Sequence, residues 1–269
     1  MTLDRVPLWV VFATAILIVL IAIEVGYRMG IVAHRRADDE KESPVSAISA
    51  AVLGLVAFML AFTFGIATDR YDTRKQLVRD EANAIRTAWH RADFLPEPDR
   101  VEANRLFLEY LDLRLNLAGT RDPNSGRIEE ALSATGQIQR RLWDIAVANA
   151  RKDMNSDVAA LYIESLNEVF AIHALRVAVG LQARIPTGIW LSLVGITILG
   201  MMAVGYHTGI SGSKRSMSRP FLALSFAIVI VLIASLDRPN THFIEVTQQP
   251  LIDVHTQIAA GPGSRDPVD

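Results

Sequence analysis

Long apolar runs occur four times along the chain, two before and two after a long, more polar segment. They cover residues 6–27, 45–67, 187–205 and 220–236, and the fourth is the shortest. Each approaches the ~20 apolar residues that a helix needs to cross a hydrocarbon core of ~30 Å. The pattern predicts an all-α membrane protein with four transmembrane helices and a helical domain inserted between the second and the third.

The first apolar run has a competing interpretation as a secretory signal peptide, because it too follows a basic residue near the N-terminus. The run is too long for a signal core, and no cleavage site of small residues follows it. Glu24, Tyr27 and Arg28 instead form the kind of polar end that a helix has at a membrane surface. We therefore interpret the run as a transmembrane helix.

The polar segment keeps a helical pattern through most of its length. After the second run no proline occurs before Pro96, so one helix is predicted to run from the membrane into solvent. Further helices are predicted at residues 97–118, 127–150 and 156–183, which prolines, glycines and asparagines separate. No stretch of the sequence shows a convincing strand pattern.

These elements divide the chain into four parts. Residues 1–67 form a first transmembrane helix pair, residues 68–186 a helical extramembrane domain, residues 187–236 a second transmembrane pair, and residues 237–269 a C-terminal tail. The end of this tail, residues 259–269, has the composition of a disordered segment.

The helix that begins in the second run has two distinct faces. At about 100° per residue, Phe58, Phe62 and Gly65 fall on one stripe. The same stripe continues beyond the membrane with five polar residues, which are Asp69, Thr73, Gln76, Asp80 and Asn83. A hydrophobic constriction that opens into a polar vestibule would have this pattern. The alternative is that the two phenylalanines face lipid and that the polar stripe is an ordinary solvated surface.

The opposite face of this helix is apolar throughout. It carries Leu53, Val56, Leu60, Phe64 and Ala67, and then Tyr71, Val78, Ala82, Ile85 and Trp89. An apolar stripe that continues in water must be buried against other helices, so we expect the middle domain to pack on it.

Small residues at a spacing of four flank the aromatic stripe. Ala57, Ala61 and Gly65 would let the backbones of neighbouring helices approach closely, and small residues favour this kind of packing in a membrane. We therefore expect copies of this helix to pack around an axis in a homo-oligomer.

Composition excludes several classes of function. The net charge of −2 argues against a nucleic-acid partner, and the chain has no cysteine for disulfide or thiolate chemistry. The six histidines have no zinc-like spacing, and the acidic residues Asp69, Asp72, Asp80 and Glu81 alternate with basic ones, which favours ion pairs within the helix. No motif supports an enzyme, so no catalytic residue, metal site or cofactor is predicted.

Basic residues gather in two of the short loops. They are Arg28, Arg35, Arg36 and Lys41 in the first loop and Lys214, Arg215 and Arg219 in the third, which has no acidic residue. Basic short loops are typical of the cytoplasmic side, so the middle domain is predicted to be extracytoplasmic. Arg70, Arg74, Lys75 and Arg79 at the other end of the second run act against this orientation. The basic third loop would also suit anionic membrane lipids as partners.

Two stretches resemble the signatures of the bacterial bestrophin-like family. The first is LAFTFGIATDRYDTRKQLVRDEANAIRTAWHRAD at residues 60–93, followed by Leu95 and Pro96. The second is LDRP at residues 236–239 with VTQQPLID at residues 246–253. The resemblance implies a multi-pass protein of the bacterial plasma (inner) membrane.

True bestrophins are pentameric anion channels whose second membrane helix lines an aromatic neck. The resemblance therefore implies an ion channel, a pentameric homo-oligomer with inorganic ions as partners, and neck positions at Phe58, Phe62 and Ile66. Two features differ from that family. Bestrophins keep the middle block in the cytoplasm, and Asp69 and Asp80 on the predicted pore stripe would attract cations. The alternative function is a membrane-anchored interaction or sensing protein that conducts nothing.

Overall fold

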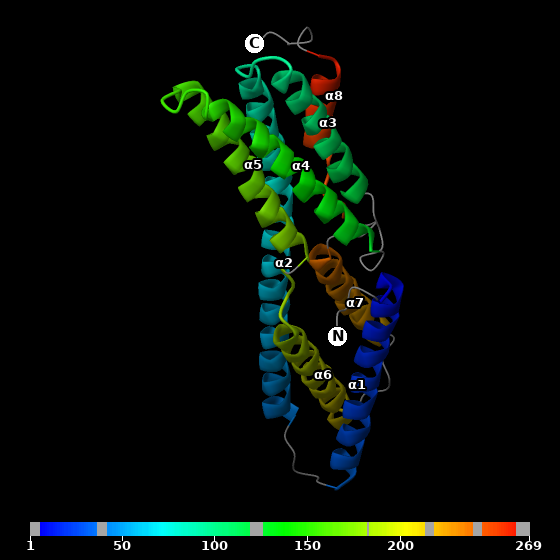
Figure 1. Ribbon diagram of the computed structural model, residues 1–269. Helices are drawn as coiled ribbons and strands as arrows, with labels where there is room; N and C mark the ends of the chain where they lie inside the picture. The colour runs from blue at the N-terminus through cyan, green and yellow to red at the C-terminus, as the bar shows by residue number, and fades with distance from the viewer. Residues whose placement is uncertain are drawn as a thin grey trace, which may run out of the picture. The chain divides into compact units, whose positions relative to one another are not determined.

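The computed structural model describes residues 6–36, 42–118, 126–181, 183–212, 218–238 and 244–261. Within these residues the chain forms eight α-helices and no strand (Figure 1). It divides into two compact units. The first unit comprises Met1–Tyr71 and Arg184–Ile244, and the second comprises Asp72–Ala183 and Glu245–Asp269.

The first unit contains the four apolar runs, and all four are helical. They form α1 (Leu8–Arg36), the first part of α2 (Glu42–Ala92), α6 (Thr187–Ile210) and α7 (Ser218–Asp237). Helix α1 packs against both α6 and α7. One buried cluster joins α2 to α6 and α7 through Val56, Leu193 and Ile233, while another joins α1 to α6 through Ile23 and Met201. The protein is a multi-pass membrane protein.

Helices α1 and α6 approach each other at the distance of backbone contact. A Cβ atom on Gly26 would lie 2.0 Å from the carbonyl oxygen of Met202, and one on Gly205 would lie 2.1 Å from that of Ile23. Gly30 and Gly209 are equally confined, with backbone oxygens at 2.3 Å and 2.4 Å. Only glycine fits at these four positions, because any side chain would push the two backbones apart.

The second unit contains the rest of α2 together with four further helices. These are α3 (Asp99–Ala118), α4 (Arg127–Ala150), α5 (Asp157–Leu181) and α8 (Gln249–Ala259). The predicted helices at residues 97–118, 127–150 and 156–183 correspond to α3, α4 and α5. The core of the unit contains the fully buried side chains of Ile85, Leu106, Phe107, Leu142 and Leu166.

Helix α8 lies in a part of the chain for which the sequence analysis proposed only a tail. Its residues Leu251, Val254 and Ile258 are buried, and the helix packs on α3. The spacing of three and four residues places these side chains on one face, so a short amphipathic helix closes the core. Of the predicted disordered segment, residues 262–269 lie outside the described residues.

The four helices that were expected to span the membrane are all candidates by length and composition, and a further helix joins them. Five helices in the described residues are long and apolar enough to cross a membrane, and the fifth is α5. Helix α5 owes part of its apolar character to Tyr162, Leu166 and Val169, which are buried in the core of the second unit. Sequence composition cannot separate a helix that is apolar because it lies in lipid from one that is apolar because it lies in a protein core.

The close approach of α1 and α6 predicts that Gly205 tolerates no side chain. We expect Gly205→Ala to lower the free energy of unfolding by about 1–3 kcal/mol or more, because the added methyl overpacks a backbone contact. Gly195 is the matched control, since it lies in the same helix and a Cβ there meets nothing within 4 Å. Thermal unfolding of both variants in detergent measures the difference, and equal melting temperatures would contradict the prediction.

Candidate functional site

The predicted constriction residues differ in their surroundings. Phe58 and Phe62 are 65% and 54% exposed, and their rings stack with centroids 6.5 Å apart and planes inclined by 16°. Ile66, one turn further along α2, is partly buried and packs against the cluster that contains Leu60 and Ala67. The structure therefore places the two phenylalanines on the outer surface of the first unit, whereas Ile66 is partly covered by neighbouring side chains.

The small residues that flank the phenylalanines lie on the same open side of α2. Ala57 and Ala61 are exposed, and a Cβ on Gly65 would meet nothing within 4 Å. The other side of the helix is buried, with Val56 and Ala67 fully enclosed. Phe64 is an exception, because the sequence pattern assigned it to the buried face and it is 38% exposed.

The polar stripe of α2 also lies on an exposed surface. Asp69 is exposed in the first unit, and Thr73, Gln76 and Asn83 are exposed in the second, where Asp80 is half-buried. The Nε2 of Gln76 donates a hydrogen bond of 2.8 Å to Oδ1 of Asp80. On the opposite face of this part of α2, the predicted apolar residues Val78, Ala82, Ile85 and Trp89 are buried. The helix thus has the two faces that its periodicity predicted.

Two polar residues of the LDRP stretch hold the ends of helices in the first unit. Oδ1 of Asp237 accepts a hydrogen bond of 2.9 Å from the backbone N–H of Ile185 and lies 3.8 Å from Nη1 of Arg70. Arg238 donates a hydrogen bond of 2.7 Å to the carbonyl oxygen of Val6. These contacts connect the segment before α6, the end of α7, α2 and the segment before α1. In the sequence these two residues stand out only as part of a family signature.

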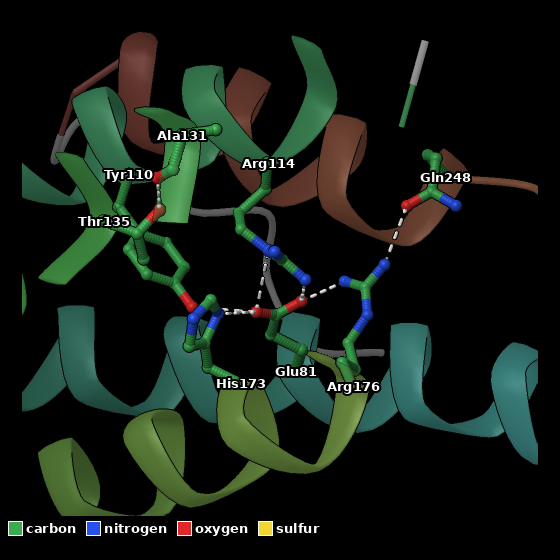
Figure 2. Close-up of polar contacts among 8 residues, drawn as sticks. All are labelled: Glu81, Tyr110, Arg114, Ala131, Thr135, His173, Arg176 and Gln248. Atoms are coloured by element: carbon green, nitrogen blue, oxygen red, sulfur yellow. Dashed lines mark hydrogen bonds and ion pairs between the residues drawn. The ribbon is translucent and has the colours of Figure 1, made fainter. Parts of the chain in front are cut away.

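The second unit contains a buried charge cluster, defined here as Glu81, Tyr110, Arg114, His173 and Arg176 (Figure 2). The hydroxyl of Tyr110 donates a hydrogen bond of 2.8 Å to Oε1 of Glu81, and Nε of Arg114 lies 3.1 Å from the same oxygen. Arg176 pairs with the other oxygen, Oε2. Nδ1 of His173 lies 3.8 Å from Oε1.

The charge cluster corrects the expectation that Glu81 pairs with basic residues of its own helix. The side chain of Glu81 is fully buried, so it points into the core and meets residues of α3 and α5. Arg176 also donates a hydrogen bond of 3.2 Å to Oε1 of Gln248, the residue that precedes α8. Sequence separations of 33 and 95 residues explain why no local pattern revealed these partners.

Glu81 remains ionised although it is buried. Burial raises its pKa, but the contact with His173, the charges of Arg114 and Arg176 and the hydroxyl of Tyr110 together lower the pKa from the usual 4.5 to about 2. Because the pKa falls on folding, the ionised carboxylate stabilises the folded unit fully above about pH 4.5. This stabilisation is lost as the pH falls towards 2.

Comparison with known proteins agrees with this fold. The family model of the bestrophin-like domain matches residues 8–251, which is most of the chain. The chain belongs to the bestrophin-like family. A search of curated protein sequences finds no match for this bestrophin-like protein.

Solved structures similar to this bestrophin-like protein include a bacterial bestrophin homologue from Klebsiella pneumoniae. A variant of that homologue matches with a TM-score of 0.66 and 15% identity over 94% of this chain and 98% of the other. A structure of the homologue phased with zinc matches with a TM-score of 0.63 and 15% identity over 93% and 99% of the two chains. At this identity the likeness shows a shared fold.

The charge cluster predicts that Glu81→Gln strongly destabilises this bestrophin-like protein. Removing one partner of a buried ion pair costs about 3–5 kcal/mol, because the guanidinium groups are left without a counter-charge. Glu102→Gln is the control, since Glu102 also pairs with two arginines, Arg105 and Arg141, but is 36% exposed. There we expect a loss of about 1 kcal/mol or less. Denaturant titrations followed by tryptophan fluorescence compare the two, and similar losses would show that burial of Glu81 is not decisive.

Proposed function

We propose that this bestrophin-like protein is a homo-oligomeric ion channel whose pore is lined by α2. One observation carries the proposal: two stacked phenylalanines lie exposed on α2, and polar residues follow them on the same stripe. A pore-lining helix that forms an apolar constriction and then a water-filled region would show this arrangement. Membership of the bestrophin-like family supports the proposal.

In the proposed pore, Phe58 and Phe62 from each copy form a narrow, dry constriction, with Ile66 at its polar end. Asp69, Thr73, Gln76, Asp80 and Asn83 line the vestibule beyond it. Carboxylates along a low-dielectric path concentrate negative potential, so Asp69 and Asp80 favour cations. This selectivity would differ from that of the anion-conducting bestrophins.

The proposed oligomer packs through the small residues of α2. Ala57 and Ala61 are exposed and Gly65 has open space above it, so each can receive the backbone of a neighbouring helix. We propose five copies, following the bestrophin resemblance.

We further propose that α5 belongs to the extramembrane domain, which leaves four transmembrane helices. His173 and Arg176 of α5 contact Glu81 in the buried charge cluster, and Glu81 lies 14 residues beyond the apolar run that ends at Ala67. At 1.5 Å per residue this separation is about 21 Å along α2. Helix α5 therefore contacts α2 at a residue that lies beyond the apolar run.

The competing function is a membrane-anchored interaction or sensing protein. One observation favours it: Phe221 on α7 and Trp9 on α1 are 71% and 72% exposed, more than the two phenylalanines of α2. Exposed aromatic residues are expected on any helix that faces lipid, so the exposure of Phe62 alone does not require a pore. Conduction separates the two functions.

On conduction, Phe62→Ala should raise ion flux several-fold, because removing an aromatic ring widens and wets the constriction. Phe221→Ala is the matched control and should leave flux unchanged. Adding Asp69→Asn and Asp80→Asn to the Phe62→Ala protein should shift the reversal potential under a salt gradient towards anion selectivity. Planar bilayer recordings measure both effects. If the Phe62→Ala protein passes no more current than protein-free controls, the interaction protein becomes the better assignment.

On assembly, Ala61→Leu and Gly65→Leu should each reduce the mass of the oligomer in native mass spectrometry. A leucine at either position prevents the close approach of neighbouring backbones. Gly195→Leu places the same side chain at an open position of α6 and should leave the mass unchanged. An unchanged mass in all three variants would place the interface elsewhere.

On orientation, we propose that the middle domain is extracytoplasmic, because exposed basic residues such as Arg28 lie at the opposite ends of the transmembrane helices. Lys41, Lys214 and Arg215, which also support this orientation, lie outside the described residues. Alkaline phosphatase fused after residue 119 should then be active in the bacterial plasma membrane. An inactive fusion there beside an active one at residue 212 would establish the reverse orientation, which the bestrophin resemblance implies.

A further inference from the structure

The buried charge cluster of the second unit carries more positive than negative charge. Its ion pairs join two guanidinium groups, those of Arg114 and Arg176, to the single carboxylate of Glu81. Among the described residues no ion pair joins either guanidinium to another acid. The cluster therefore has a formal charge of +1, before any proton is added to His173.

An exposed charge cluster in the same unit shows a different balance. Arg105 and Arg141 contact Glu102, and Arg105 also contacts Glu109, so two acidic residues face two basic ones. Water would screen an imbalance there at little cost, yet the charges are equal. In the buried cluster the excess charge has little access to water, and an uncompensated buried charge is strongly unfavourable.

Hydrogen-bond donors in the buried charge cluster are also left over. Nε of Arg114 and Nδ1 of His173 are buried and lie 3.1 Å and 3.8 Å from Oε1 of Glu81, but neither forms a hydrogen bond of suitable geometry in the described residues. Arg114 and His173 are only 5% and 11% exposed in their side chains. Oε1 of Glu81 thus faces Tyr110, Arg114 and His173 at once and accepts a well-aligned hydrogen bond only from Tyr110. Poorly satisfied buried donors are unfavourable, so both the excess charge and these donors favour one additional acceptor.

We propose that the buried charge cluster binds a small inorganic anion, chloride, beside Arg114, His173 and Arg176. The surrounding groups are the N–H donors of two guanidiniums and the imidazole, and chloride accepts hydrogen bonds without needing an acceptor in return. Arg176 is 14% exposed, so one edge of the cluster is open to solvent for the entry of an ion. The bound anion neutralises the excess charge where α2, α3 and α5 meet.

The first test is the dependence of thermal unfolding on chloride. Full-length protein in detergent is melted in sodium gluconate and in sodium chloride at one ionic strength. We expect the melting temperature to rise by about 3 °C at saturating chloride, as ligand binding to the folded state requires. Arg176→Gln should abolish this rise, and Arg105→Gln, a change in the exposed cluster, should preserve it. An equal rise in the Arg176→Gln protein, or no rise in the wild-type protein, would overturn the proposal.

The second test locates the ion directly and does not depend on the stability of a variant. Crystals of the wild-type protein grown in sodium bromide should show an anomalous peak beside the guanidinium of Arg176. Sulfate at the same ionic strength tests whether a larger oxyanion also raises the melting temperature, and a rise with sulfate but not with chloride would contradict the choice of a halide. The absence of a bromide peak at the cluster would overturn the site. Neither test requires the protein to conduct ions.

Discussion

The rest of the structure depends on helix α2, which is much longer than a membrane-spanning helix needs to be. Helix α2 has 51 residues and is therefore about 76 Å long, far more than the ~30 Å that a hydrocarbon core requires. Its apolar face needs partners along its whole length. In the first unit they come from α6 and α7, and in the second from α3, α4, α5 and α8. The other face remains open in both units, which makes it the candidate lining of a pore.

Ionic contacts join helices that are far apart in the sequence. Glu81 connects α2 to α3 and α5, and Asp237 connects the ends of α6 and α7 to Arg70. Because Glu81 is buried, loss of one of its partners leaves charge uncompensated in the core, which destabilises the folded unit. Because the cluster is buried, water compensates its excess positive charge poorly, and this imbalance is the basis of the proposed anion site.

Glycine has two different roles in the first unit. Gly26 and Gly205 lie at a contact where a single Cβ atom would collide with backbone, whereas Gly65 faces open space. Both kinds of glycine belong to apolar helices. Gly26 and Gly205 define the packing within one chain, and Gly65 leaves a surface on which a second copy can pack.

The sequence by itself determined the four apolar helices, the three central helices and the two faces of α2, because these depend on run lengths and on a periodicity of 3.6 residues. Only the tertiary structure decided the partners of Glu81, the role of α8 and the use of Gly205 rather than Gly65 in intrachain packing. It also showed that Tyr162, Leu166 and Val169 of α5, a helix long and apolar enough to be a membrane span, lie in a core. The physical reason is common to all of these: each depends on contacts between residues far apart in the chain, and local patterns record solvent preference without naming the partner.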